Sequence, residues 1–305
     1  MNNQNPILTV GSIALDNLET IKGKRERVLG GSATYFAMAA SHFTEVRVVG
    51  VVGTDFTDDG HNIFKSENID TKNLQIVEGE TFSWGGKYTD DFSTRDTLFT
   101  NLGVFENFKP IINNNHLDSP IVFLGNIHPE LQLDVIHQMS NDSLIITDTM
   151  NLWINISLDC LWDVISKTDI LLLNDEEAEQ LTGEQNLKIA GKKLIQKGPK
   201  TVVIKKGAKG SMICGEITMD NIPVFPGIDV IDPTGAGDSF AGGFCGYIAK
   251  YGTENLIDAI LFGSAIASFT VSQFSVDGLR EIKMSDIKER VDVISHLLSE
   301  KISID

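Results

Sequence analysis

The sequence is poor in cysteine, in basic residues and in long apolar runs. Its three cysteines, Cys160, Cys214 and Cys245, lie far apart, which argues against a disulfide framework and a zinc site and indicates a reducing compartment. Lysine and arginine number 25 against 42 aspartates and glutamates, which gives a formal net charge of −17. That charge disfavours nucleic acid and anionic membranes as partners, because both select a basic face.

A membrane span and a signal peptide are also missing from the pattern. The longest apolar stretch, 257–271, contains Asp258, Gly263, Ser264 and Ser268 and falls short of the roughly 18 apolar residues that a span needs. The first residues pass from a polar leader directly into an apolar run, without a basic region or a small-residue cleavage site. We therefore expect a soluble, cytoplasmic protein.

Short apolar segments alternate with helical patterns along the first two thirds of the chain. Near-continuous apolar runs separated by helices are typical of a parallel sheet that is buried on both faces. The predicted strands are 7–13, 46–53, 121–126, 143–150, 169–174 and 201–207. Beyond about residue 234 the pattern predicts helices at 236–250, 254–273 and 284–299. The fold class is therefore α/β, with a central, mostly parallel sheet flanked by helices.

Two polar stretches, 14–29 and 79–105, interrupt this rhythm. Both are polar, and in 79–105 threonine and aromatic residues alternate with polar ones, which predicts exposed strands. We find no repeat and no linker of low complexity between them and the rest of the chain. We expect residues 1–305 to form a single domain, with these stretches as insertions that build a small β appendage.

The segment VIDPTGAGDSFAGGF carries the strongest chemical signal. Pro233 suits the first turn of a helix, and Gly235, Ala236 and Gly237 leave backbone N–H groups uncovered at its positive end. A carboxylate at Asp238 in the same turn, beside this anion hole, provides what phosphoryl transfer to a hydroxyl requires. An ordinary capped helix with an acidic first turn is the alternative.

Further along the same helix, Gly242, Gly243 and Gly246 occupy interior positions. Glycine costs about 1 kcal/mol against alanine in a helix interior, so we expect close packing against a neighbouring helix here.

A second candidate site follows an apolar strand in LLLNDEEAEQLTG. Asn174 and Glu177 lie three residues apart at a strand-to-helix corner, where ligands of open α/β sheets bind. Their oxygens suit a water-coordinated Mg²⁺ that bridges nucleotide phosphates. The alternative is that acidic residues in a first helical turn only complement the helix dipole.

The segment TVVIKKGAKGSMI is predicted to form a strand, a glycine-bounded turn and a second strand. We interpret the turn between Gly207 and Gly210 as a nucleotide contact, with Lys205 or Lys206 near phosphate. A simple hairpin with two turn glycines is the alternative.

These segments together resemble the ribokinase-like (PfkB) family of carbohydrate and nucleoside kinases. DPTGAGDSFAGGF is similar to the family's second signature, NDEEAEQLTG to its magnesium and phosphate motif, and LGGSATYFAMAAS to its first glycine signature. VGVVGTDFTDDG matches the usual sequel, and the order of the motifs is that of the family. The resemblance implies the ribokinase-like fold, with the two insertions as a β-sheet lid that excludes water when it closes, and it implies ATP and Mg²⁺ as cofactors.

The resemblance also implies roles at the phosphoryl-transfer site. Asp238 would be the catalytic base, next to the amides of Gly235, Ala236 and Gly237. Nucleotide, phosphate and Mg²⁺ would be bound by Asn174, Glu177, Lys205, Gly207, Gly210 and Ala265, the last within the segment FGSAIASF that would line the adenine pocket. Asp232 matches a position that helps to bind a monovalent cation such as K⁺, or serves as a helix cap.

On the acceptor side, Asp16 matches the aspartate that holds sugar hydroxyls, and Gly30 and Gly31 match the glycines against which the acceptor lies. The sequence departs from ribokinases in having Ser32 and Tyr35 where those enzymes carry lysine and asparagine. We expect Tyr35 to stack on a flat ring or a larger acceptor.

Other side chains are candidates for contacts with the acceptor or its phosphate. In the lid stretch, Trp84 is a candidate contact for a nucleobase, and Arg95 or Lys87 for a phosphate. Asn126 ends a strand that should reach the same crevice, as do His128, Asp148 and Asn151, although each residue type is also common as a local cap.

The leading interpretation is an ATP- and Mg²⁺-dependent kinase that phosphorylates a hydroxymethyl group of a sugar or sugar-like acceptor. A nucleoside kinase of the adenosine or cytidine type is the alternative within the same class. A catalytically idle sensor that binds a sugar or nucleotide is the alternative from another class. Exposed aromatic residues on the lid also suggest a homodimer formed through the lid.

Overall fold

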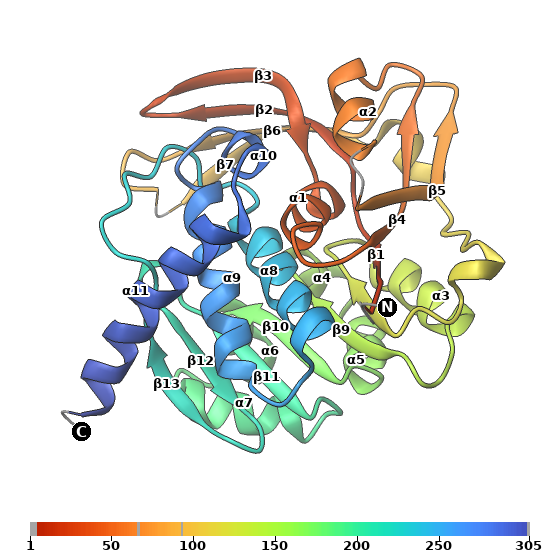
Figure 1. Ribbon diagram of the computed structural model, residues 1–305. Helices are drawn as coiled ribbons and strands as arrows, with labels where there is room; N and C mark the ends of the chain where they lie inside the picture. Colours follow the sequence, from red (N-terminus) through yellow and green to blue (C-terminus); the bar gives the residue numbers. More distant parts are fainter. Residues whose placement is uncertain (1–4, 66–67, 93, 304–305) are drawn as a thin grey trace.

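The computed structural model describes residues 5–65, 68–92 and 94–303, and a nine-stranded sheet forms its centre (Figure 1). In spatial order the strands are β13-β12-β11-β10-β9-β8-β1-β4-β5, and only β11–β12 and β12–β13 pair antiparallel. Their bounds are β1 Ile7–Val10, β4 Val46–Gly53, β5 Ile69–Val77, β8 Ile121–Leu124, β9 Leu144–Asp148, β10 Ile170–Asn174, β11 Thr201–Lys205, β12 Ser211–Cys214 and β13 Met219–Ile222. The predicted mostly parallel sheet is confirmed.

Helices cover both faces of this sheet, which explains why its central strands are apolar throughout (Figure 1). The helices are α1 Ser32–Ala40, α2 Asp58–Phe64, α3 Pro129–Gln138, α4 Asn151–Ile156, α5 Leu158–Ser166, α6 Asp175–Thr182, α7 Leu187–Ile195, α8 Ala236–Tyr251, α9 Leu256–Thr270, α10 Asp277–Arg280 and α11 Met284–Ile302. Short 3₁₀ turns are η1 Gly103–Asn107, η2 Asn114–His116 and η3 Gly207–Lys209. One core contains α1, α8, α9 and α11, while α3 and α5 to α7 pack on the opposite face.

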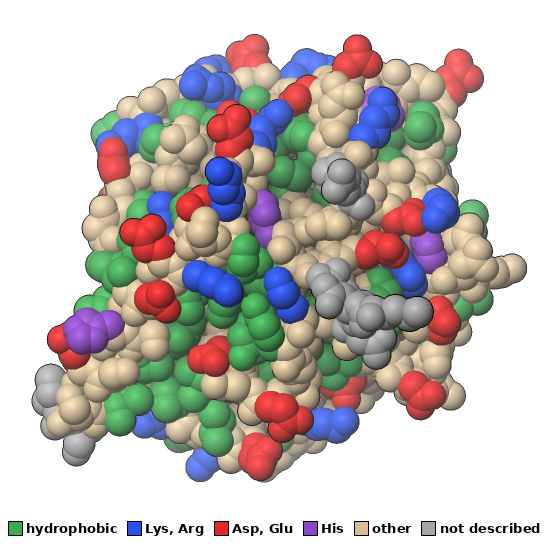
Figure 2. All heavy atoms as spheres, viewed as in Figure 1, with side chains coloured by type: hydrophobic (Ala, Val, Ile, Leu, Met, Phe, Trp, Pro, Cys, Tyr) green, Lys and Arg blue, Asp and Glu red, His purple; other side chains and the backbone are tan. Residues whose placement is uncertain are grey.

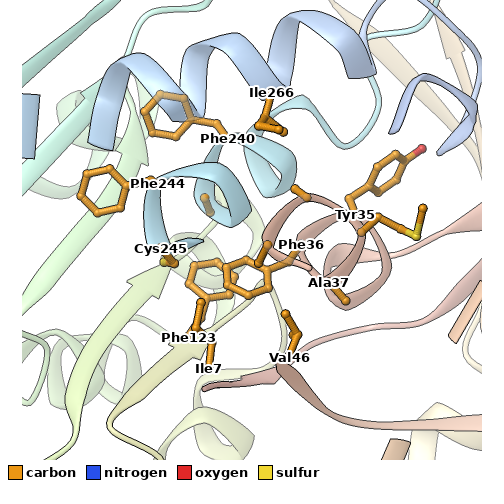
Figure 3. Close-up of a cluster of buried hydrophobic side chains, with 14 of the residues drawn as sticks. Ile7, Tyr35, Phe36, Ala37, Val46, Phe123, Phe240, Phe244, Cys245 and Ile266 are labelled. Atoms are coloured by element: carbon orange, nitrogen blue, oxygen red, sulfur yellow. The ribbon is translucent and has the colours of Figure 1, made fainter. Parts of the chain in front are cut away.

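Helix α8 lies between α1 and α9, and its glycines allow this close approach. A side chain at Gly242 would meet the Phe36 carbonyl of α1 at 2.6 Å, and one at Gly243 would meet the Phe262 carbonyl of α9 at 2.9 Å. Figure 3 shows the neighbouring core, where the rings of Phe36 and Phe123 stack with centroids 4.1 Å apart. The expectation that these glycines serve helix packing is therefore confirmed.

The two polar stretches form a separate four-stranded sheet, the lid, across one end of the molecule (Figure 1). Its strands, in spatial order, are β3 Gly23–Gly30, β2 Ala14–Thr20, β6 Ser83–Tyr88 and β7 Arg95–Asn101. Strand β7 is exposed along its whole length, as expected, whereas β2 is mostly buried. The prediction of exposed strands is therefore wrong for β2, because it is an inner strand of the lid and faces the body of the protein.

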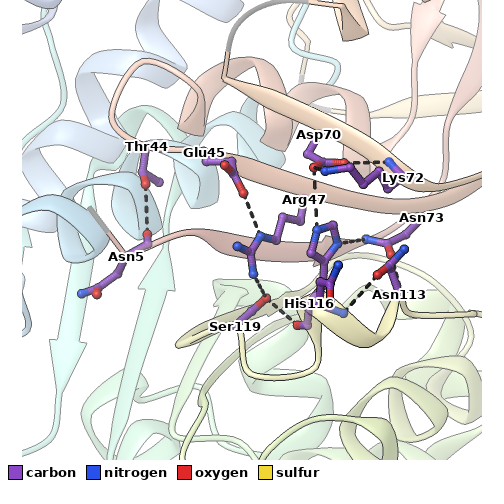
Figure 4. Close-up of polar contacts among 11 residues, drawn as sticks. Asn5, Thr44, Glu45, Arg47, Asp70, Lys72, Asn73, Asn113, His116 and Ser119 are labelled. Carbon is purple, nitrogen blue, oxygen red and sulfur yellow. Dashed lines mark hydrogen bonds and ion pairs between the residues drawn. The ribbon is translucent and has the colours of Figure 1, made fainter. Parts of the chain in front are cut away.

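A cluster of polar side chains joins β4, β5 and η2 at the amino ends of the strands (Figure 4). Arg47 donates to Glu45 at 2.8 Å and to Ser119 at 2.9 Å, and Asn73 binds His116 at 2.9 Å. Burial and the nearby Arg47 lower the pKa of His116. The groups of this cluster bind one another, so we interpret it as a structural element that holds the edge of the sheet.

Charged side chains lie on the surface, and the described helices lack the apolar length of a membrane span. Acidic and basic side chains are interspersed on the face shown in Figure 2. Within the described ranges, no helix combines the length and the apolar character needed to cross a membrane.

Candidate active site

A pocket of about 550 Å³ opens where the carboxyl ends of β9, β10 and β11 meet the start of α8 and the lid. The position follows from the fold, because ligands of open parallel sheets bind beyond the carboxyl ends of the strands. Among the residues that line it are Tyr88, Arg95, Asn126, Asp148, Asn174, Glu177, Lys205, Gly207, Gly237 and Asp238. The structure thus brings together most of the residues that the sequence suggested for phosphate and nucleotide.

The loop before α8 is held in a fixed turn. Asp232 accepts hydrogen bonds from the N–H groups of Thr234 at 2.9 Å and Ser275 at 3.1 Å, so both its carboxylate oxygens serve backbone donors. Gly235 then adopts a left-handed conformation with φ +74, which favours glycine. The completely buried carboxylate of Asp232 is thus occupied by the loop itself, but it does not cap α8, whose N-cap residue Gly235 has no side-chain cap hydrogen bond.

Some backbone N–H groups at the start of α8 donate to the protein itself, and others have no backbone acceptor in the described part of the chain. The N–H of Ala236 donates to the Pro233 carbonyl at 3.2 Å, so the expectation that it serves an anion is corrected. Among the described residues, the N–H groups of Gly235 and Gly237 have no backbone acceptor. An unpaired amide at a helix N-terminus attracts an anion, and Gly237 lines the pocket.

Asp238 lies one residue further on and faces the same pocket. Burial and the negative charge of Asp148 raise the pKa of Asp238 to about 7, while Lys205 and Arg95 act in the opposite direction. A carboxyl group with a pKa near neutrality is well matched to accept a proton from an alcohol during a reaction. The geometry thus places a suitable base beside free amides.

A buried ion pair crosses the floor of the pocket. The Lys205 Nζ lies 2.6 Å from the Asp148 Oδ2, with side-chain exposures of 17% and 6%. Burial alone would lower the pKa of Lys205, but the carboxylates of Asp148 and Glu177 outweigh it and raise the pKa. Lys205 therefore stays a cation, and it lies next to Gly237, where a side chain would meet its Nζ at 3.3 Å.

The prominence of Asp148 goes beyond what the sequence indicated, since we considered it only among residues that end strands. Its pairing with Lys205 depends on two strands that are 57 residues apart in the chain and on either side of β10. Of the other residues considered with it, His128 accepts a hydrogen bond from the Glu130 N–H at 3.2 Å and caps α3. Asn151 lies on the pocket wall.

Asn174 and Glu177 form a reciprocal capping box at the start of α6. The Asn174 side chain accepts from the Glu177 N–H at 2.8 Å, and the Glu177 carboxylate accepts from the Asn174 N–H at 2.8 Å. Burial and the charge of Asp148 raise the pKa of Glu177 to about 7. Asn174 and Glu177 therefore stabilise the start of α6, and both residues also line the pocket.

The donor set of this corner fits Mg²⁺. Asn174, Glu177 and Asp148 place amide and carboxylate oxygens on one wall, and oxygen is the ligand that Mg²⁺ prefers. Over the described part of the chain, no three His, Cys, Asp or Glu side chains are grouped so as to hold a metal ion by themselves. A hydrated Mg²⁺ that also binds nucleotide phosphates agrees with both observations, since Mg²⁺ usually keeps several waters.

On the acceptor side, Asp16 is 3% exposed, and its Oδ1 has no hydrogen-bond partner among the described residues. Burial and the charge of Asp232 raise the pKa of Asp16 to about 8. Gly30 lies directly against this carboxylate, since a side chain there would overlap its Oδ2. Gly31 has φ +91 and precedes α1, where a side chain would overlap the Ser12 carbonyl. An unpaired buried oxygen is an exception in native structures, and this one is free to accept a hydrogen bond from a donor such as a hydroxyl group.

The expectation that Tyr35 stacks on the acceptor is not met. Its ring is 1% exposed and lies beneath Gly235, where any side chain would overlap the ring. In Figure 3 the ring leaves α1 in a direction away from the Phe36–Phe123 stack. The face of Tyr35 is therefore occupied by the loop before α8, because only glycine lets that loop cross the ring.

Trp84 and Arg95 form a stacked pair on the lid. The Arg95 guanidinium lies 5.1 Å from the centre of the Trp84 ring, which lies flat over Gly86. The indole N–H donates to the Thr97 hydroxyl at 3.3 Å. The charge of Arg95 lowers the pKa of both Asp16 and Asp238, so this lid cation acts on the acceptor side and on the base.

Asn126 faces the pocket in an orientation that the sequence did not predict. Its Oδ1 accepts from the Trp153 indole N–H at 2.7 Å, and its Nδ2 approaches the Met150 sulfur at 3.0 Å. The Asn126 side-chain oxygen is thus engaged by Trp153 of α4, a contact between residues 27 positions apart that no local pattern reveals.

Two of the predicted nucleotide contacts need correction. Gly207 lines the pocket with φ +55 and open space around it, in agreement with the prediction. Gly210 instead faces the Ile222 carbonyl of β13, where a side chain would overlap it, so it serves the turn. Ala265 is completely buried, because its side of α9 packs into the core with α8, and it is not among the residues that line the pocket described above.

The sequence of this chain is similar to those of known kinases. The model of the pfkB family of carbohydrate kinases matches residues 5–282. The cytidine kinase of Thermococcus kodakarensis is 29% identical over 78% of this chain and 86% of its own length. The nucleoside kinase of Methanocaldococcus jannaschii is 28% identical over 87% of this chain and 90% of its own.

Ribokinases are also similar, over a shorter part of the sequence. The ribokinase of Staphylococcus aureus is 34% identical over 39% of this chain and 42% of its own length. The fold of the Arabidopsis thaliana ribokinase complexed with ribose and ATP superposes with a TM-score of 0.76 at 20% identity, covering 94% of this chain and 98% of that one. The chain therefore belongs to the pfkB family of carbohydrate kinases, phosphotransferases that act on an alcohol group.

Proposed function

We propose that this protein is an ATP- and Mg²⁺-dependent nucleoside kinase that phosphorylates a hydroxymethyl group of the ribose. The observation that carries the proposal is the register of the lid, in which Trp84 of β6 is the strand partner of Asp16 in β2. Residues paired across neighbouring strands project to the same face of a sheet, so an indole lies beside the carboxylate proposed for sugar hydroxyls. A nucleoside presents both a flat base and a diol to such a surface.

The range of the similarities supports a nucleoside over a free sugar. The cytidine and nucleoside kinases are similar over 78% and 87% of this chain, whereas the ribokinase of Staphylococcus aureus is similar over 39% of it. The side chains that ribokinases use in the first glycine signature are replaced here by Ser32 and Tyr35, and the Tyr35 ring is buried. We therefore favour the nucleoside alternative over the sugar kinase that the motifs alone suggested.

In the proposed reaction, Asp238 accepts the proton of the attacking hydroxyl while the γ-phosphoryl group passes to that oxygen. The amides of Gly235 and Gly237 and the cation of Lys205 stabilise the charge on the transferring group. Asn174 and Glu177 would hold a hydrated Mg²⁺, which would supply positive charge to neutralise the nucleotide phosphates. Positioning does most of the work, because the transition state of phosphoryl transfer is loose and the base takes its proton late.

The test is ADP release from ATP and Mg²⁺ with a panel of nucleosides and the corresponding free sugars. We expect kcat/KM for the best nucleoside to exceed that for ribose by at least about 100-fold, since stacking of one base on an aromatic ring contributes about 1–3 kcal/mol and the base gains further contacts. Turnover of free sugars alone would overturn the nucleoside assignment and keep the kinase. Binding of nucleosides without any turnover would favour the sensor.

The same assay addresses K⁺. Asp232 is completely buried, and each of its carboxylate oxygens already accepts one backbone N–H, so a cation could use only the remaining lone pairs inside this closed loop. We expect replacement of K⁺ by Na⁺ to change kcat by less than about twofold. A strong dependence on K⁺ would restore the cation-site interpretation.

We also propose that two copies associate through the lid. Every residue of β7 is exposed at the edge of the lid sheet, and Leu98 and Phe99 retain 53% and 39% of their surface. An exposed edge strand with apolar side chains is a template for pairing with another chain. Light scattering should give a dimer that Leu98→Lys converts to a monomer, and a monomeric wild-type protein would contradict this proposal.

A further inference from the structure

The lid is attached to the segment 229–234, which leads directly into the anion-binding turn at Gly235. This attachment uses both parts of the lid, β2 with its turn and β6. Three residue pairs carry it: Lys22 Nζ donates to Asp229 Oδ1 at 2.7 Å and Oδ2 at 3.0 Å, Thr20 Oγ1 donates to the Ile231 carbonyl at 3.0 Å, and the hydroxyls of Tyr88 and Thr234 bond at 3.0 Å.

These contacts differ in burial. The side chains of Lys22 and Asp229 are 40% and 77% exposed, so their pairing is weakened by solvent. Tyr88 and Thr234 are each only 8% exposed, and their hydrogen bond is buried. Removal of one partner of a buried hydrogen bond leaves the other unsatisfied, which is costly. The Tyr88–Thr234 bond is therefore the contact that should matter most.

Thr234 is held on two sides. Its N–H donates to Asp232 in the body of the protein, and its side chain binds Tyr88 of the lid. The next residue is Gly235, whose φ of +74 sets the direction of the free amides at the start of α8. The position of the Tyr88 hydroxyl thus bears on the geometry of the turn that receives phosphate.

Tyr88 also contacts the lid cation. Arg95 is its partner across β6 and β7, and charge and hydrogen bonding from Arg95 oppose the rise in the pKa of Tyr88 that burial causes. The Tyr88 phenol therefore connects the Arg95 guanidinium, whose charge acts on Asp238, with the loop that leads into the helix of Asp238. This arrangement depends on the lid lying against the loop.

We propose that Tyr88 is a positioning residue whose hydroxyl couples docking of the lid to the geometry of the anion-binding turn through Thr234. Without this bond the lid opens more often, and water competes with the acceptor. In the competing reaction, water oxygen bonds to the γ-phosphorus, the bond to the bridging oxygen of ADP breaks, and Asp238 takes a proton from water. The proposal rests on phosphoryl transfer and not on the identity of the acceptor.

The test is hydrolysis of ATP by the full-length protein in the absence of any acceptor. Tyr88→Phe and Thr234→Val each remove one hydroxyl, and we expect each to raise the hydrolysis rate about fivefold, the effect of one buried hydrogen bond on an opening equilibrium. The double variant should match the single ones, because both break the same bond. Thr234→Ser keeps the hydroxyl and should stay closer to the wild type than Thr234→Val. Lys22→Met removes the exposed contact to the same segment and should change the rate less than twofold.

Hydrogen exchange provides a readout that needs no turnover. In Tyr88→Phe, exchange of the backbone amides of 229–235 should become faster together with that of β6, while β1 stays unchanged as an internal reference for folding. Effects of the two single variants that multiply in the double variant would overturn the proposal, because the residues would then act independently. Unchanged hydrolysis and exchange in Tyr88→Phe would overturn it as well.

Discussion

Replacement of Lys205 by Met examines the buried ion pair under the proposed phosphate site. Lys205 and Asp148 are 17% and 6% exposed at a distance of 2.6 Å, so loss of the cation leaves an unpaired buried carboxylate. Breaking a buried pair in this way costs about 3–5 kcal/mol. Asp148→Asn should cost less, because Lys205 keeps Glu177 as a neighbouring carboxylate. Urea unfolding measures both, and equal losses in the two variants would contradict this assignment of charges.

The same pair of variants shifts the pH dependence in opposite directions. A general base works only when it is ionised, so the acid limb of kcat/KM should lie near pH 7, the value to which burial raises the pKa of Asp238 in the free protein. Lys205 lowers this pKa and Asp148 raises it. Lys205→Met should therefore move the limb to higher pH and Asp148→Asn to lower pH. A limb that stays in place, or that moves the same way in both variants, would refute the reasoning.

Three further variants address the acceptor side and the loop. Trp84→Ala should raise KM for the nucleoside by roughly 5- to 100-fold, because about 1–3 kcal/mol of stacking is lost. KM for ATP should stay unchanged. Equal changes in the two KM values would contradict a role of Trp84 in acceptor binding. Asp16 has a pKa raised from 3.8 to about 8, so its contribution to stability is complete below pH 3.8 and is lost as the pH rises through 8. Asp16→Asn should therefore flatten the fall in unfolding free energy between pH 4 and 8, and an unchanged slope would exclude Asp16 as its cause. Gly235→Ala should unfold at lower temperature and lose activity, because a side chain at this position, where φ is +74, overlaps the Tyr35 ring. Gly227→Ala is the control for backbone strain alone, since Gly227 also has a positive φ but has open space around it.

The sequence predicted the layers of the fold well, because the strands are buried on both faces and so appear as uninterrupted apolar runs. It also located the start of α8 and the Asn174–Glu177 corner, since capping and anion binding require particular residue types at short spacings. Local chemistry of this kind is visible without a structure. For the same reason the glycines of α8 could be assigned to close packing before the neighbouring helices were known.

The failures concern contacts between distant segments. Tyr35 was expected to face a ligand because its position resembles one that binds sugar, but the Gly235 loop, 200 residues later, covers its ring. Ala265 was expected in a nucleotide pocket, and the packing of α9 buries it completely. The Lys205–Asp148 pair and the contact of Trp153 with Asn126 likewise join residues on different elements, so no spacing in the sequence indicates them.

The central claim is that Asp238 accepts the proton of the acceptor hydroxyl, and single-turnover transfer from ATP to the best nucleoside in Asp238→Asn tests it most directly. Asparagine keeps the shape of the side chain and cannot take the proton, so the transfer rate should fall by about 10²–10⁴ while the Kd values for ATP and nucleoside stay within a few-fold. Asp229→Asn, an exposed carboxylate of the preceding segment, serves as the matched control and should behave as the wild type. A transfer rate in Asp238→Asn within tenfold of the wild type would contradict the account.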